Sequence, residues 1–127
     1  MIHHASIGVR DLSRSRRFYD AVLGPLGHGC LSDSPGSLGH GASSPMLWLI
    51  LTDRPVIADA MSGLHFCFGA PHRAAVDAVH AAGVRAGGKD HGGPGLRTDY
   101  DPGYYAAFLI DPDGYRIEAY CQLPAPA

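Results

Sequence analysis

A strand followed by a helix occurs twice in this chain, at two places 61 residues apart. Residues 2–9 alternate between polar and apolar side chains, as expected for a strand with one buried face, and residues 63–70 do the same. When the first segment is shifted onto the second without a gap, His4 falls on His65. The identity between the two copies is weak, but the order of elements is the same. The pattern therefore indicates a duplicated unit of about 60 residues.

Each of these strands leads into a segment with one apolar helical face. The first segment has Asp11 or Ser13 available as its N-cap, and Gly24 begins a stop signal. The second has Pro71 at a position that suits a first turn, and its apolar stripe ends before Gly83. The sequence thus predicts one helix in each repeated unit.

Three further strands complete each unit, which gives the order β-α-β-β-β twice. This is an α+β layout of two βαβββ modules, in which a helix covers one face of each sheet and the other face is free for chemistry. The first module is expected to use residues 27–32, a glycine-rich hairpin region running to residue 44, and an apolar strand at 46–52. The second is expected to use a short strand at 83–86, a glycine-rich loop at 87–95, and strands at 104–110 and 115–121.

The composition bounds the class of protein. With 127 residues the chain is expected to form one domain, and a net charge of −2 gives no electrostatic footprint for DNA or RNA. A patterned strand follows the first residue and no apolar run approaches the length of a membrane span, so we expect no signal peptide and no membrane partner. Three cysteines without a CxxC pattern predict free thiols in the cytoplasm. The expected division is module one at 1–52, a linker at 53–62, module two at 63–121 and a tail at 122–127.

Glu118 is the only glutamate in the chain, and it lies in an otherwise apolar strand. Burying an unpaired charge is costly, so a carboxylate at this position needs a partner. Because it alternates with Ile117 and Ala119, its side chain is expected to point away from the core. An ion pair with Arg116 or Arg97 on an exposed face is the simplest alternative.

His4 and His65 lie on the strand faces opposite their apolar neighbours. Small residues follow each histidine at the second and fourth positions and leave room above the sheet for a cavity. Two imidazoles and the carboxylate of Glu118 form a donor set suited to Fe(II), Mn, Ni or Zn. The alternatives are that each histidine is an ordinary surface group, or that His3 takes the place of His4 if the strand phase differs by one residue.

The glycine-rich stretch from residue 92 to 105 is the candidate substrate loop, because glycine lets the backbone approach a ligand closely. Arg97 could hold an anionic group bidentately, and Tyr100, Tyr104 or Tyr105 could donate a hydrogen bond to a developing oxyanion. The alternative is a mobile loop stiffened by aromatic packing. The remaining candidates are His91 as an acid-base group, and Trp48 and Cys67 as substrate-binding residues.

Residues 4–12 and the motif D-P-D-G-x-x-I-E at 111–118 resemble the opening and closing segments of the vicinal oxygen chelate superfamily. This group contains glyoxalase I, bleomycin-resistance proteins and extradiol dioxygenases. The resemblance implies two βαβββ modules forming a curled mixed sheet around a cavity, a homodimer, and a divalent metal held by His4, His65 and Glu118.

One departure from the family pattern bears on the activity. Glyoxalase I enzymes usually take a fourth ligand from the last strand of the first module, but residues 46–51 contain no metal-binding side chain. The three remaining ligands are similar to those of extradiol dioxygenases. We therefore expect a metal-dependent lyase, isomerase or dioxygenase that chelates a small oxygen-rich substrate at the metal. The alternative is a non-catalytic protein that binds a drug or metabolite, similar to bleomycin-resistance proteins.

Overall fold

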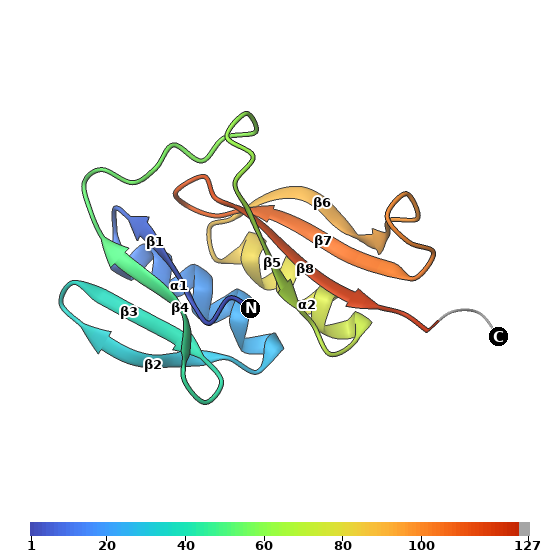
Figure 1. Ribbon diagram of the computed structural model, residues 1–127, viewed down its shortest axis with the longest axis horizontal. Coiled ribbons are helices and arrows are strands. Elements are labelled where there is room, and N and C mark those ends of the chain that lie inside the picture. The colour runs from blue at the N-terminus through green and yellow to red at the C-terminus, as the bar shows by residue number, and fades with distance from the viewer. Residues whose placement is uncertain (125–127) are drawn as a thin grey trace.

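The computed structural model describes residues 1–124 and contains two modules with the same order of elements (Figure 1). The first comprises β1 (Ala5–Val9), α1 (Leu12–Leu23), a short 3₁₀ helix η1 (Gly24–Leu26), β2 (Gly29–Ser34), β3 (Ser37–Gly41) and β4 (Pro45–Leu51). The second comprises β5 (His65–Gly69), α2 (Arg73–Arg85), β6 (Lys89–Leu96), β7 (Tyr104–Ile110) and β8 (Arg116–Gln122).

The two sheets have the same topology. Their strand orders are β1-β4-β3-β2 and β5-β8-β7-β6, and the first strand of each module pairs in parallel with the last. The other pairings are antiparallel. This repeat of topology confirms the predicted α+β fold of two βαβββ modules. The sheets are two separate four-stranded units rather than one closed barrel.

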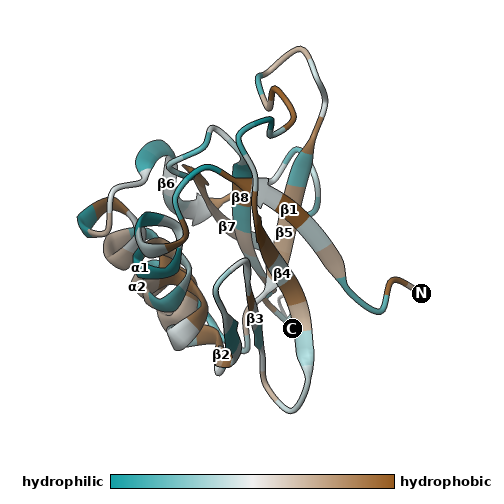
Figure 2. Ribbon diagram, turned by 90° about the vertical axis from the view of Figure 1, so that its left-hand side faces the viewer, coloured by the Kyte–Doolittle hydropathy of each residue, from teal (hydrophilic) through white to brown (hydrophobic). Residues whose placement is uncertain are grey.

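Both helices lie on the same side of the molecule, and the two sheets lie on the other (Figure 2). The helices pack against each other, and α2 also contacts β6, β7 and β8. The buried apolar residues of both modules form one cluster, to which α1 contributes Val22 and Leu23, and α2 contributes Val76 and Val79. The opposite face of each sheet is left without a helical cover.

The second module departs from the sequence prediction at its glycines. Residues 83–86 were expected to form a strand, but the helix α2 continues to Arg85. Gly83 lies where the helices cross, because a Cβ there would lie 2.4 Å from the Leu109 side chain and 2.9 Å from Val22. The glycine at this position is therefore explained by close packing rather than by helix termination. Residues 87–95, expected to form a loop, mostly belong to the irregular strand β6.

The ends of the elements follow local capping chemistry. Asp11, one of the two predicted N-cap residues, is the N-cap of α1. Its side chain accepts a hydrogen bond from the Arg14 backbone N–H. The N-cap of α2 is His72, so Pro71 precedes the helix instead of forming its first turn. The first strand begins only at Ala5, which leaves His4 before it. Residues 125–127 of the expected tail lie outside the described residues.

The turn between β7 and β8 joins the two modules. The Asp113 carboxylate accepts hydrogen bonds from the Arg10 backbone, Arg14 Nη2 and Ser15 Oγ, at 3.0–3.2 Å. Next to it, Asp111 accepts a hydrogen bond of 2.5 Å from the hydroxyl of Tyr19 on α1. The D-P-D-G motif therefore has a structural role as the contact between the second module and the start of α1.

All three cysteines are free, as the sequence predicted. No helix within residues 1–124 combines the length and the apolar character needed to cross a membrane.

Replacing Gly83 by alanine is expected to lower the free energy of unfolding by about 1–3 kcal/mol, because a methyl group would overpack the helix crossing. In an ordinary helix the same change would stabilise by about 1 kcal/mol, so the sign of the effect is the test. Urea unfolding followed by circular dichroism measures it. Gly24→Ala is the control, because a Cβ there would meet nothing within 4 Å. A Gly83→Ala protein as stable as the wild type would contradict the close crossing.

Replacing Asp113 by alanine is expected to lower the free energy of unfolding by about 2–3 kcal/mol, because three hydrogen bonds to one carboxylate are lost. The Asp113 side chain is only 1% exposed, so in the variant water cannot readily reach the three donors to replace the lost hydrogen bonds. The exposed Asp99 makes no side-chain hydrogen bond within residues 1–124, and Asp99→Ala serves as the matched control in the same urea titration. Equal stability of the two variants would show that the turn does not join the modules.

Candidate functional site

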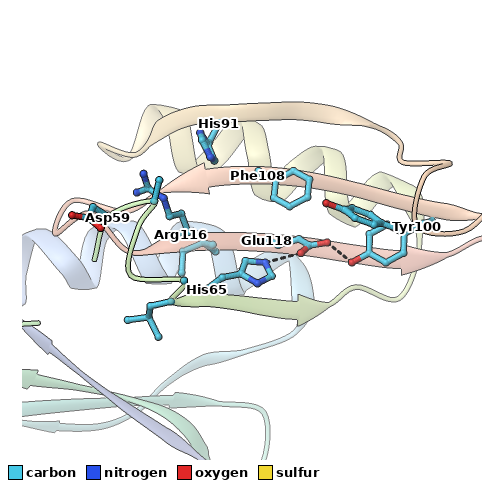
Figure 3. Close-up of a pocket in the computed structure, with 12 residues that line it drawn as sticks. Asp59, His65, His91, Tyr100, Phe108, Arg116 and Glu118 are labelled. Carbon is cyan, nitrogen blue, oxygen red and sulfur yellow. Dashed lines mark hydrogen bonds and ion pairs between the residues drawn. The ribbon is translucent and has the colours of Figure 1, made fainter. Parts of the chain in front are cut away.

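The open face of the second sheet carries a pocket of about 620 Å³, within the range of small-molecule sites (Figure 3). The linker and the start of β5 form one side of it, and the strands form its floor. Its lining includes side chains from the linker (Asp59), β5 (His65), β6 (His91), the β6–β7 loop (Tyr100), β7 (Tyr104 and Phe108) and β8 (Arg116 and Glu118).

Glu118 lies in the centre of this floor. On β8, Ile117 and Ala119 face the helices and are buried in the core, so strand alternation directs Glu118 to the opposite, open face. Its backbone pairs with Cys67 on one side and Phe108 on the other. Although it is on the open face, Glu118 is only 3% exposed.

Two hydrogen bonds satisfy the buried carboxylate. Its Oε1 lies 2.7 Å from His65 Nε2, and its Oε2 accepts a hydrogen bond of 2.5 Å from the Tyr104 hydroxyl. The predicted alternative partners do not contact it: Arg116 donates to the carbonyl of Gly114, and Arg97 donates to that of Gly93. Glu118 is thus held by an imidazole and a phenol, not by an arginine.

Tyr104 is fixed by its aromatic neighbours as well as by Glu118. Its ring packs against Tyr120 with centroids 4.1 Å apart and meets Tyr100 edge-on at 5.1 Å. Burial raises the pKa of the Tyr104 hydroxyl well above its usual value, and the hydrogen bond to Glu118 raises it further. At neutral pH Tyr104 therefore keeps its proton and remains a hydrogen-bond donor beside the carboxylate.

Cys67 shares the open face with His65, two residues along β5, and lies opposite Glu118 in the sheet register. Cys67 is exposed as a residue, but partial burial of its thiol raises the pKa to about 12, with a further contribution from the negative charge of Glu118. The thiol is consequently protonated at neutral pH and is not a nucleophile. Cys67 is not among the residues that line the pocket, so its proposed contact with a substrate stays a prediction.

Four other predicted residues are not brought into this pocket. His4 is exposed, and its Nδ1 lies 2.8 Å from His3 Nδ1. Trp48 lies on the first sheet beside Gly39. The Tyr105 hydroxyl donates to Asp77 on α2, on the opposite side of the second sheet. The guanidinium of Arg97 lies over the Phe108 ring, 5.3 Å from its centroid.

The donor atoms in one chain fit part of a metal site. His65 Nε2 and Glu118 Oε1 are adjacent, and both residues line the pocket, so a divalent cation could replace the proton between them. Within residues 1–124, however, no three His, Cys, Asp or Glu side chains are close enough to one another to hold a metal ion. One chain therefore supplies two neighbouring ligands of the predicted trio, and His4 lies apart from them.

Several lining residues were not predicted as parts of the site, and Arg116 and Phe108 are the most important of them. Arg116 was considered only as a partner of Glu118, although its position two residues earlier on the same strand directs it to the same face. Phe108 pairs with Glu118 across β7 and β8. That pairing depends on the register of two strands, which the sequence does not specify.

Comparisons with known proteins agree on the fold. The family model of the Glyoxalase/Bleomycin resistance protein/Dioxygenase superfamily matches residues 1–119. The crystal structure of a glyoxalase/bleomycin resistance protein from Albidiferax ferrireducens T118 is 32% identical with a TM-score of 0.81, over 92% of this chain and 95% of that one. A putative glyoxalase from Bacillus halodurans is 26% identical with a TM-score of 0.72, over 94% of each chain.

A more distant structure shares the fold alone. The fosfomycin resistance protein FosX from Mesorhizobium loti is 16% identical with a TM-score of 0.69, over 94% of this chain and 90% of that one. A search of curated proteins found no match. The family match over nearly the whole chain shows that it belongs to the Glyoxalase/Bleomycin resistance protein/Dioxygenase superfamily.

Iodoacetamide at pH 8 is expected to alkylate Cys67 about 30-fold more slowly in the folded protein than in the denatured one. The raised pKa leaves about a thousandth of the usual thiolate, and the greater nucleophilicity of a basic thiolate offsets only part of this loss. Mass spectrometry of the Cys67 peptide measures the rate. Glu118→Gln removes the neighbouring charge and should accelerate the reaction. Rapid alkylation in the folded wild type would show that the pKa of the Cys67 thiol is not raised.

Proposed function

We propose that this member of the superfamily is a metal-dependent enzyme that acts on a small oxygen-rich substrate by bidentate chelation at a divalent ion. The contact between His65 and Glu118 at 2.7 Å, in the floor of an open pocket, supports the proposal most directly. Iron, manganese, nickel and zinc all suit imidazole and carboxylate ligands. The ion would supply a Lewis acid for two substrate oxygens, which is the chemistry of a lyase, an isomerase or a dioxygenase.

The side chains around the ion have separate proposed roles. Glu118 is a ligand, and its second oxygen receives the hydrogen bond from Tyr104. Tyr104 keeps its proton at neutral pH, and if its hydroxyl turned from Glu118 towards the substrate it would donate to negative charge developing on a substrate oxygen. Tyr100 and Phe108 line the same side of the pocket and would contact the body of a substrate.

We propose that His4 of a second copy of the chain completes the site. The N-terminal segment leads away from both sheets (Figure 2), so His4 is free to reach another molecule. Exposed apolar side chains occur in this segment, at the end of β4 and in the linker, and exposed apolar surface is typical of an interface. They are Met1, Ile2, Ile50, Leu51, Val56, Ile57 and Met61. A symmetric dimer would form two such sites.

The second candidate function is non-catalytic binding of a drug or metabolite. The pocket itself favours this candidate, because its size and aromatic lining are sufficient to bind a small molecule without a metal. The two functions differ in one observable, which is whether a divalent ion copurifies with the protein.

A reducing compartment fits this chemistry. All three cysteines are free, and ferrous iron and free thiols both persist under reducing conditions. The cytoplasm is therefore the proposed location.

Protein purified without chelator is expected to contain about one divalent ion per chain, and His65→Ala and Glu118→Ala are each expected to lose it. Inductively coupled plasma mass spectrometry measures the content. His80→Ala is the control, because His80 lies on α2 and bonds Asp90 outside the pocket. Unchanged metal content in Glu118→Ala would remove the basis of the proposal, and a metal-free wild type would favour the binding protein.

Mixing two inactive variants tests the contribution of the second copy. Neither His4→Ala nor Glu118→Ala should bind metal alone, but after they are unfolded and refolded together the metal content should recover to about a quarter of the wild-type value. Random pairing makes half of the dimers mixed, and each mixed dimer has one complete site of two. No recovery, with dimers confirmed by sedimentation, would place all ligands in one chain.

A further inference from the structure

One end of the pocket carries hydrogen-bonding groups, one of them a guanidinium, that the proposed metal chemistry does not use. Arg116 and His91 lie at this end in Figure 3, Tyr100 lies at the other, and Glu118 and His65 lie between them. In the sheet register Arg116 is directly opposite His65. Any group bound by Arg116 would consequently be adjacent to the proposed metal ligands.

Arg116 has donors to spare. Its side chain makes one hydrogen bond, from Nη1 to the carbonyl of Gly114 at 3.1 Å, and no acidic group lies within 4.0 Å of it in residues 1–124. A guanidinium carries five N–H donors, so most remain available. The side chain is partly buried, which strengthens its interaction with an anion relative to one at a fully exposed site. His91 adds a ring nitrogen that makes no hydrogen bond within the same residues.

The acidic groups of the pocket are already engaged. Glu118 is bound to His65 and Tyr104, and Asp59 accepts hydrogen bonds from the backbone N–H groups of Met61 and Ser62. Neither forms an ion pair with Arg116. The guanidinium of Arg116 therefore keeps free donors at this end of the cavity.

The other lining is mostly aromatic. Tyr100, Tyr104 and Phe108 line the pocket away from Arg116, although Tyr104 packs against Tyr120 and Arg97 lies over one face of the Phe108 ring. Such an aromatic wall favours a planar, unsaturated body over a flexible polar one. The two ends of the pocket thus recognise two different parts of one molecule.

We propose that the substrate is a small aromatic or similarly planar carboxylic acid, whose carboxylate binds Arg116 and whose ring lies against the aromatic wall. This inference rests on the proposed function in that it assigns a substrate class to the same site. Arg116 thereby takes the anion-binding role that the sequence suggested for Arg97. The guanidinium of Arg97 instead donates to the Gly93 carbonyl and lies over the Phe108 ring. A carboxylate accepts two parallel hydrogen bonds from a guanidinium, which gives both affinity and orientation.

Isothermal titration calorimetry with benzoate, its neutral analogue benzamide, and acetate tests the proposal. The wild type is expected to bind benzoate at least about tenfold more tightly than either of the others. Arg116→Gln should lower the affinity for benzoate to that for benzamide and leave the affinity for benzamide unchanged. Arg116→Lys should retain part of the preference, because lysine keeps the positive charge but cannot form two parallel hydrogen bonds. Arg85→Gln, on the last turn of α2, is the matched control and should bind as the wild type does.

Several results would overturn the inference. The first is a preference for benzoate over benzamide that survives in Arg116→Gln. The second is loss of that preference in Arg97→Gln. The third is equal affinity of the wild type for acetate and for benzoate. Loss of the preference in His65→Ala but not in Arg116→Gln would place the carboxylate on the metal. The metal content of each sample separates the two proposals. A metal-free wild type that still shows the Arg116-dependent preference would refute the enzyme proposal and support the anion site.

Discussion

The contact of the β7–β8 turn with α1 is the interaction on which the rest of the structure depends. Asp111 accepts a hydrogen bond from the hydroxyl of Tyr19, and Asp113 accepts three hydrogen bonds from residues at the start of the first helix. Because β8 begins two residues after this turn, the same contact fixes the strand that carries Arg116 and Glu118. A motif that resembles part of a metal site thus also supplies the polar contact between the two modules, beside the packing of α1 against α2.

The position of β8 explains how a carboxylate can be buried on an open sheet face. The strand lies between β5 and β7, so Glu118 has neighbours on both sides, and His65 and Tyr104 supply the hydrogen bonds that burial demands. Small residues on β5 leave room above it. The result is a cavity with a polar centre, an aromatic end and a cationic end, in which a substrate would be bound at three points.

The sequence predicted more of the fold than of the site. Repetition of the pattern and strand alternation predicted two modules and the outward direction of His65 and Glu118, because both depend only on local periodicity. The same reasoning misplaced residues 83–86 and 87–95, since it treated glycine as a terminator. Gly83 is instead required by the neighbouring helix, and that contact joins residues far apart in the sequence.

The sequence by itself determined the duplicated architecture and the chemical types of the candidate ligands. Tertiary structure decided which of them meet. His65 and Glu118 are brought together by the parallel pairing of β5 with β8, whereas His4 belongs to the other sheet and remains apart in a single chain. Tyr104 and Tyr105 are adjacent in sequence, yet only Tyr104 reaches the site, because successive strand residues face opposite sides of the sheet. Periodicity is a local property, while contacts between strands depend on register and packing across the whole chain.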